Sequence, residues 1–232
     1  MTTFFTWSFF WQTIGIVGAV IFFGRFYVQW IWSEKLGRSV IPIIFWYMSA
    51  VGSIMLLGYG VFILSPVGVF SYGFNLLVYV RNLIHIWRER GKLTPFRYYF
   101  AHTLVVVAFI VSAIVIIYVF YQKFFHVRGM ERHLAIQHSF WILLGLLGQA
   151  LFALRFLIQW LATEVKKQSV IPPIFWYISL FASALQIISY SFQSEWLYAL
   201  GLLTTLFVYF RNIWLLKKGQ GTLPTPNSKA EL

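Results

Sequence analysis

The sequence predicts an all-α, polytopic membrane protein with seven transmembrane helices, arranged as two parallel three-helix repeats and one extra helix between them. Three observations support this fold class: the composition, the number of long apolar segments and an internal repeat. Of the 232 residues, 60% are hydrophobic and 10% are charged, and the mean hydropathy is +0.76. A soluble domain carries about 25% charged residues. The composition therefore excludes a soluble protein.

Seven apolar segments are long enough to cross a bilayer, which takes about 20 residues. The first segment follows no basic stretch and is longer than the core of a signal peptide, so we expect a retained helix. The seven segments lie near residues 8–32, 41–63, 66–87, 97–122, 138–162, 171–193 and 195–216.

The internal repeat is clearest at residues 25–49, which recur at 155–179 without insertion or deletion. The offset is 130, and 14 of the 25 positions are identical. Such self-similarity indicates a duplicated structural unit. The match continues upstream and downstream, so each unit holds three helices. The flanking matches are Gly15, Gly18, Tyr79, Arg81 and Asn82 with Gly145, Gly148, Tyr209, Arg211 and Asn212.

The fourth segment has no counterpart in the repeat. Because three is an odd number, direct fusion of two units would invert the second one, and a single additional helix restores the parallel orientation. Parallel repeats about an axis along the membrane normal are one of the transporter architectures. We divide the chain into a first repeat (8–87), a linker with the fourth helix (88–137), a second repeat (138–216) and a disordered cytoplasmic tail (217–232).

The distribution of Lys and Arg predicts the orientation in the membrane. Eleven of these residues fall in the loops and tail of one side and three in those of the other. By the positive-inside rule, the N-terminus lies outside and the C-terminus in the cytoplasm. The formal charge of +12 fits basic loops next to anionic lipid better than nucleic-acid binding.

Two absent residue types exclude several chemistries. The chain contains no Cys, which removes disulfides and thiolate sites, and no Asp, which removes Ser-His-Asp triads and the acidic metal-binding pair that sugar-nucleotide glycosyltransferases use. The five histidines do not repeat and lack metal-ligand spacing. We therefore expect no metal, no cofactor and no catalytic residue, although enzymatic activity stays open.

The repeated residues read RFxxQW, then SE or TE, then SxxPxxFWxxS, and later YxRN. This pattern resembles the lipid A biosynthesis N-terminal domain family, which is grouped with the PQ-loop, SWEET and SemiSWEET proteins and is built from the same three-helix unit. The resemblance implies a bacterial inner-membrane protein of lipid A or glycolipid metabolism. The family takes its name from fusions ahead of lipid-A-disaccharide synthase. These 232 residues do not include that synthase's catalytic domain, so the resemblance does not imply its activity.

The chain departs from the family pattern at one place in each repeat. The family commonly has an acidic residue before Pro-Val and a Gln shortly after, where this chain has Ser65 before Pro66, and Tyr72. The second repeat has Glu195 followed by Trp196 instead. No Pro-Gln dipeptide is present, so the proline hinge of sugar transporters is not expected here.

Polar residues inside the apolar segments are the candidates for binding. Arg25 and Gln29 are four residues apart and share one helix face. Asn75, Tyr79 and Asn82 form a stripe on the third helix of the first repeat, with Arg81 beside it. Counted from the helix ends at about 1.5 Å per residue, the arginines of both repeats lie at one depth, roughly 10 Å inside the cytoplasmic surface.

Four arginines at the same depth inside the membrane require negatively charged partners. We expect Glu34 and Glu164, each at a helix C-terminus where the dipole disfavours negative charge, to pair with two of them. Arg is suited to phosphate oxygens, so the other two would hold the phosphate of a lipid-linked saccharide in a cytoplasm-facing cavity. The predicted substrate-binding residues are Arg25, Gln29, Glu34, Tyr79, Arg81 and Asn82, with Arg155, Gln159, Glu164, Tyr209, Arg211 and Asn212 in the second repeat.

Structural roles compete with binding at several of these positions. Arginines near a helix end also extend to lipid phosphates without a specific ligand, above all Arg81 and Arg211. Tryptophans at the interface anchor the protein, and Pro in a first helical turn and Ser three residues earlier suit helix starts. The predicted structural residues are Trp30, Ser39, Pro42, Trp46, Trp160, Ser169, Pro172 and Trp176.

Three functions follow from these features. The first is a carrier or flippase for a phosphorylated lipid-linked saccharide in lipid A or envelope glycolipid biosynthesis. The second is an accessory or anchoring protein for a glycosyltransferase partner. The third is a membrane enzyme of lipid A assembly, which the absence of Asp makes the weakest. The expected partners are a membrane lipid or a lipid-linked sugar phosphate, not nucleic acid, and the oligomeric state is open.

Overall fold

The computed structural model describes residues 2–36, 42–125, 131–166 and 172–217. Within these ranges every element is an α-helix, and each of the seven helices contains a stretch of 19 to 28 residues apolar enough to cross a membrane. The predicted all-α, seven-helix membrane fold is confirmed. The helices are α1 (Thr2–Leu36), α2 (Ile43–Phe62), α3 (Pro66–Glu89), α4 (Pro95–Phe125), α5 (Glu131–Lys166), α6 (Ile174–Phe192) and α7 (Trp196–Lys217).

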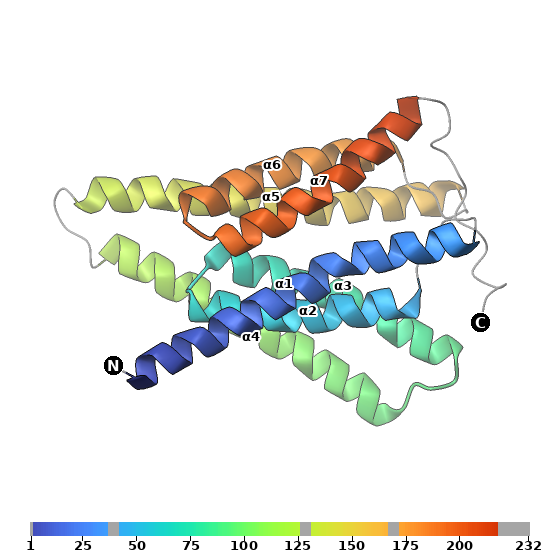
Figure 1. The fold of residues 1–232 in the computed structure, drawn as a ribbon, viewed down its shortest axis with the longest axis horizontal. Helices are drawn as coiled ribbons and strands as arrows, with labels where there is room; N and C mark the ends of the chain where they lie inside the picture. Colours follow the sequence, from blue (N-terminus) through green and yellow to red (C-terminus); the bar gives the residue numbers. More distant parts are fainter. Residues whose placement is uncertain (1, 37–41, 126–130, 167–171, 218–232) are drawn as a thin grey trace.

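The helices form two groups with the same internal order. In the first group α2 packs on α1 and α3, and in the second α6 packs on α5 and α7. Helices α1, α3, α5 and α7 run in one direction and the other three run back, so the two groups are parallel (Figure 1). Helix α4 lies against α3 and supplies the extra crossing that the parallel arrangement needs.

The two groups meet through α1 against α7 and α3 against α5. Because α5 and α7 are the repeats of α1 and α3, these two contacts are equivalent. This equivalence is what a two-fold axis between parallel repeats requires. Which end of the bundle faces the cytoplasm stays a prediction from the charge distribution.

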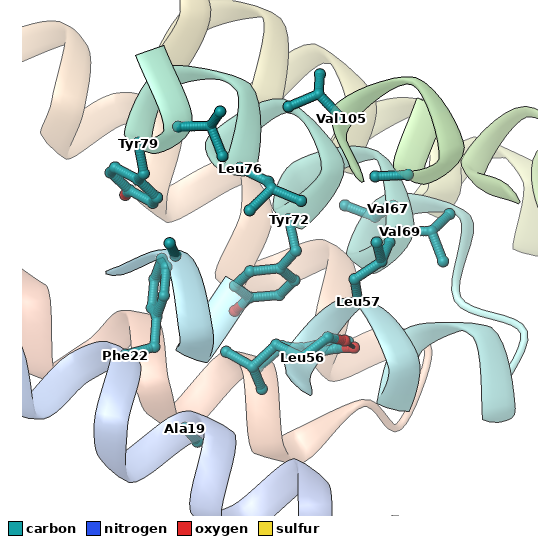
Figure 2. Close-up of a cluster of buried hydrophobic side chains, with 14 of the residues drawn as sticks. Ala19, Phe22, Leu56, Leu57, Val67, Val69, Tyr72, Leu76, Tyr79 and Val105 are labelled. Carbon is teal, nitrogen blue, oxygen red and sulfur yellow. Dashed lines mark hydrogen bonds between the residues drawn. The ribbon is translucent and has the colours of Figure 1, made fainter. Parts of the chain in front are cut away.

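Aromatic and aliphatic side chains fill the space between the helices (Figure 2). Phe22 lies beside both Tyr72 and Tyr79, with ring centroids 5.2 and 6.1 Å away. Large apolar residues also cover the outside of the bundle, such as Val20, Ile117 and Phe207. In a membrane protein this outer surface faces lipid, which is as apolar as the side chains themselves.

Repeated glycines allow the first two helices of each group to approach closely. A Cβ at Gly18 would lie 2.7 Å from Met55 Cβ, and one at Gly148 would lie 3.0 Å from the backbone oxygen of Ala182. Any side chain at these positions would therefore push α1 from α2 or α5 from α6. The small residues noted in the sequence thus set the helix spacing.

The turns that lead into α3 and α7 are also equivalent. Leu64 and Ser194 both have left-handed backbone angles, with φ of 53° and 59°. The next backbone N–H in each turn, of Ser65 and Glu195, donates to a carbonyl oxygen of the preceding helix, at 2.9 and 2.8 Å. Non-glycine residues rarely adopt this conformation. The same rare turn is present in both repeats, and Ser65 and Glu195 follow it at equivalent positions. The Ser65 hydroxyl donates a hydrogen bond to the Glu195 carboxylate, which joins the two turns.

Candidate functional site: two arginine–tyrosine pairs

Arg25 of α1 is buried in the first repeat, with 5% of its surface exposed. Its Nη1 donates to the Phe22 backbone oxygen at 2.8 Å, and its Nη2 donates to the Tyr79 hydroxyl at 3.0 Å. The guanidinium carbon lies 3.6 Å from the centre of the Phe22 ring. Tyr79 therefore orients the arginine from α3, and aromatic rings surround its charge.

Arg155 of α5 has the equivalent neighbours in the second repeat. Its Nη1 donates to the Tyr209 hydroxyl of α7 at 3.3 Å and to the Ser179 hydroxyl of α6 at 2.7 Å. Its guanidinium carbon lies 4.4 Å from the centre of the Phe152 ring. Arg155 is only half-buried, unlike Arg25. The two repeats thus share the same arginine–tyrosine hydrogen bond, but Arg155 is more exposed than Arg25.

Arg25 lies on α1 and Tyr209, the partner of Arg155, lies on α7, and these two helices are in contact where the repeats meet. Among the residues that the structure describes, no carboxylate pairs with either arginine. The Nε atom of each is also buried without a hydrogen-bond partner there. Burying a charge in an apolar medium is costly unless a counter-charge and hydrogen bonds compensate it. A buried guanidinium group with an unpaired Nε and no carboxylate partner among the described side chains is a candidate for binding an anion.

The structure does not bring the other two predicted arginines to this place. Arg81 and Arg211 are exposed. Each follows the site tyrosine by two residues, which is about 200° around the helix, so it points away from the pair. Asn82 and Asn212 donate to carbonyl oxygens of their own helices, those of Val78 and Val208, at 2.8 and 2.7 Å. Gln29 and Gln159 are half-buried on α1 and α5.

Several predicted residues lie outside the described part of the chain. Ser39 and Ser169 fall in the segments between the helices, and the side chains of Glu34, Glu164 and Trp160 are likewise not described. The expected ion pairs of the two glutamates and the capping role of the two serines therefore stay predictions.

The remaining motif residues frame the site. Trp46 and Trp176 lie against the site tyrosines Tyr79 and Tyr209, with ring centroids 6.3 Å apart in both repeats. They pack beside the arginine–tyrosine pairs, a contact that the predicted anchoring role did not include. Trp30 is 51% exposed, as an anchoring residue would be.

Pro42 and Pro172 stand just before α2 and α6 rather than inside the first turn. Their carbonyl oxygens accept the N–H of Phe45 and Phe175, at 2.9 Å in each case. Pro42 is the N-cap residue of α2, whereas the N-cap residue of α6 is Pro173, and the structural role predicted for Pro42 and Pro172 stays a prediction.

Sequence reasoning did not select Phe22, Phe152 and Ser179, which contact the arginines. The signal was present, because Phe22 and Phe152 are related by the same offset of 130 and precede the arginines by three residues, about one helical turn. Ser179 ends the repeated motif but was not connected to Arg155, because the crossing of α5 and α6 cannot be read from spacing along the chain.

A bundle of seven candidate spanning helices, with one arginine–tyrosine pair inside each of two parallel repeats, is a multi-pass membrane protein of duplicated design. The chain belongs to the lipid A biosynthesis N-terminal domain family, which it matches twice, at residues 14–84 and 144–214. The two matches lie 130 residues apart, at the offset of the sequence repeat, and each contains one arginine–tyrosine pair.

Curated relatives of the chain are lipid-A-disaccharide synthases from several Chlamydia species. The synthase of Chlamydia trachomatis is 36% identical over 178 residues, which is 72% of this chain and 28% of the synthase. The synthase of Chlamydia muridarum is 34% identical over 180 residues, 73% of this chain and 28% of that protein. The chain thus spans just over a quarter of the length of these relatives. No solved structure matches it.

Proposed function

We propose that the protein is a membrane carrier or flippase for a phosphorylated, lipid-linked saccharide in lipid A or cell-envelope glycolipid biosynthesis. The observation that carries this proposal is the arginine pair: Arg25 and Arg155 lie within the membrane-spanning helices, one in each repeat, and no described carboxylate neutralises them. The family supports a link to lipid A biosynthesis.

Phosphate is the anion that best suits this pair. A guanidinium group presents several N–H donors in a planar fork that matches phosphate oxygens, and it is more weakly hydrated than an ammonium group. Both tyrosine hydroxyls hold the forks in place from α3 and α7. A substrate with an apolar tail and a phosphorylated head would place its charge at the arginines and its acyl chains against the apolar outer surface.

The parallel duplication supports movement of the substrate rather than binding alone. In carriers built from repeats, the substrate site lies near the interface between the repeats, and rocking of one repeat against the other exposes it to alternate sides. Here each arginine is bonded within its own repeat, so the repeats can separate without breaking either arginine–tyrosine bond.

The proposal uses two of the four arginines expected from the sequence. Arg81 and Arg211 are exposed and face away from the pair, which favours contact with lipid phosphates for them. They therefore provide a matched control, because their removal takes away the same charge from the same helical bundle.

Binding of a phosphorylated lipid tests this assignment. We expect wild-type protein in mild detergent to retain an acylated saccharide phosphate, measured by native mass spectrometry. Arg25→Gln/Arg155→Gln should weaken retention at least tenfold, and Arg81→Gln/Arg211→Gln should weaken it less than twofold, because a hydrogen bond to a charged group contributes about 1.5–3 kcal/mol. Equal retention by both double variants would refute the assignment.

A second function is favoured by the size of the relatives. The chain matches only 28% of a lipid-A-disaccharide synthase, so the helical unit could anchor or supply substrate to a glycosyltransferase. In that case a glycosyltransferase should co-purify in mild detergent, and purified protein should move no lipid. An enzyme of lipid A assembly would instead convert its substrate in detergent, where the two sides of a membrane do not exist.

A further inference from the structure

A cluster of uncharged polar side chains lies between the two repeats, apart from the arginines. Gln186 of α6 donates from Nε2 to Gln149 Oε1 of α5 at 2.9 Å and to Ser71 Oγ of α3 at 3.2 Å. The Tyr190 hydroxyl of α6 donates to the same serine oxygen at 3.4 Å. All four side chains are at most 4% exposed. Two of these hydrogen bonds therefore join the first repeat to the second in the interior of the bundle.

One amide end in the cluster has no partner. Gln149 is 2% exposed, and its Nε2 makes no hydrogen bond to any described residue. The two ends of an amide are assigned from the hydrogen-bond network. Exchanging the oxygen and nitrogen of the Gln149 amide alone would place its Nε2 against Gln186 Nε2, two donors without an acceptor. Exchanging them in both glutamines would let Gln149 donate to Gln186, but it would then leave Gln149 Oε1 without a partner. With either consistent assignment, Gln149 needs one more partner.

The fold does not demand polar residues at this place. At the offset of 130, Gln149 corresponds to Ala19, Gln186 to Leu56 and Ser71 to Gly201. In that equivalent region the Phe23 ring fills the space where a Cβ of Gly201 would lie, 2.0 Å from the nearest ring atom. Tyr190 corresponds to Gly60, and beside that glycine the Tyr198 hydroxyl donates to the Leu56 backbone oxygen at 2.7 Å. The equivalent place is thus closed by the Phe23 ring and a paired tyrosine hydroxyl, and it holds neither of the two buried amides. Buried polar groups inside a membrane are rare and mark functional sites.

We propose that this cluster, Ser71 with Gln149, Gln186 and Tyr190, binds a neutral hydroxyl group of the saccharide. A hydroxyl both donates and accepts, so it satisfies Gln149 whichever amide end faces it. The cluster carries no charged side chain, which disfavours an anion. It is closed in this conformation, and separation of the repeats, which breaks the bonds to Ser71, would open it.

The identity of this ligand rests on the proposed function. Gln149 precedes Arg155 by six residues on α5, which is about 9 Å along the helix axis. Six residues also leave the two side chains about 120° apart around α5, so a lipid phosphate at Arg155 brings a sugar ring to the level of the cluster along the axis, and the ring must cross to the neighbouring face of the helix to reach it. The arginines would select the phosphate, and the amides would distinguish a saccharide from a simple phospholipid.

The residues of the first repeat supply the test variant, Gln149→Ala/Gln186→Leu. We expect its affinity for an acylated monosaccharide phosphate to fall about tenfold, because the hydrogen bonds to the hydroxyl are lost. Its affinity for phosphatidic acid with the same acyl chains should change less than twofold. Gln12→Leu, which removes an exposed glutamine of α1, is the control. Folding is checked by thermal unfolding, which should be close to wild type because the new residues already pack in the other repeat.

A third ligand, a long-chain alkyl glucoside without phosphate, separates this proposal from the proposed function. Its binding should depend on Gln149 and Gln186 but not on Arg25 and Arg155. If Arg25→Gln/Arg155→Gln binds both phosphorylated lipids as tightly as wild type, the proposed function fails. Binding of the glucoside still tests the cluster in that case. If the Gln149→Ala/Gln186→Leu variant binds the monosaccharide phosphate and the glucoside like wild type, the cluster holds water only and the inference is overturned.

Discussion

At the scale of single residues, Arg25 and Arg155 occupy equivalent positions but differ in their burial and in their hydrogen-bond partners. Among the described residues Arg25 has one side-chain partner, the Tyr79 hydroxyl, and it is almost fully buried. Arg155 has two, Ser179 and Tyr209, on one nitrogen, and remains half-buried. The first arginine is thus more completely enclosed by the bundle than the second.

This difference predicts unequal effects of removing the tyrosine hydroxyls. Tyr79→Phe should lower the free energy of unfolding by about 1–3 kcal/mol, because a buried cation loses the one side-chain acceptor that it has among the described residues. Tyr209→Phe should lower it by less, because Ser179 still accepts from Arg155. Thermal unfolding in detergent, followed by tryptophan fluorescence, measures both variants. Equal shifts, or a larger one for Tyr209→Phe, would contradict this difference between the two arginines.

The residues of the site were only partly predictable from the sequence. Repetition at a fixed offset selected Arg25, Tyr79, Arg155 and Tyr209 as candidates, but it did not predict that the tyrosines would be hydrogen-bond partners of the arginines. Depth in the membrane could not show that Tyr79 faces Arg25 and Arg81 faces outward, because residues two positions apart lie at nearly the same depth on different faces of the helix. The polar cluster around Gln186 was missed because Gln149 and Gln186 have no polar counterpart in the first repeat and lie on different helices.

At the scale of helices, the contact of α1 with α7 depends on a missing side chain. A Cβ at Gly201 would lie 2.0 Å from the Phe23 ring, which is itself buried. Gly201→Ala should therefore lower the free energy of unfolding by about 1–3 kcal/mol, as expected for overpacking. Gly24→Ala is the control, because the nearest atom to its new Cβ would be 4.0 Å away.

The control should be neutral or slightly stabilising, since Ala favours the helix over Gly by about 1 kcal/mol. Thermal unfolding in detergent compares the two variants. A Gly201→Ala protein as stable as Gly24→Ala would show that α1 and α7 can move apart without loss, and that this contact does not fix the position of the two repeats.

The helices themselves were readily predictable, because a spanning helix needs a long apolar run and few other structures satisfy the backbone in lipid. The described helices extend beyond several predicted spans, as α1 does from Thr2 to Leu36 against 8–32. The additional helical turns lie at the helix ends and contain polar and charged residues. Hydropathy alone assigns such residues to loops.

At the scale of the whole molecule, the two repeats form a pair around one axis, with α4 outside it. The sequence predicted this arrangement because an odd number of helices per repeat requires one more crossing. It could not predict that the repeats would differ in polarity at their interface. That difference makes the pair asymmetric, with apolar packing around Phe23 in one half and amides around Gln186 in the other.

Movement of a phosphorylated glycolipid across a membrane is the central claim for the whole molecule. Purified protein would be reconstituted into liposomes with a fluorescent acylated saccharide phosphate, and the fraction accessible to an external quencher followed in time. We predict rapid exchange between leaflets with wild-type protein and with Arg81→Gln/Arg211→Gln, and exchange reduced to the rate of protein-free liposomes with Arg25→Gln/Arg155→Gln. Exchange at the wild-type rate in that last variant, or none with wild-type protein, would contradict the account.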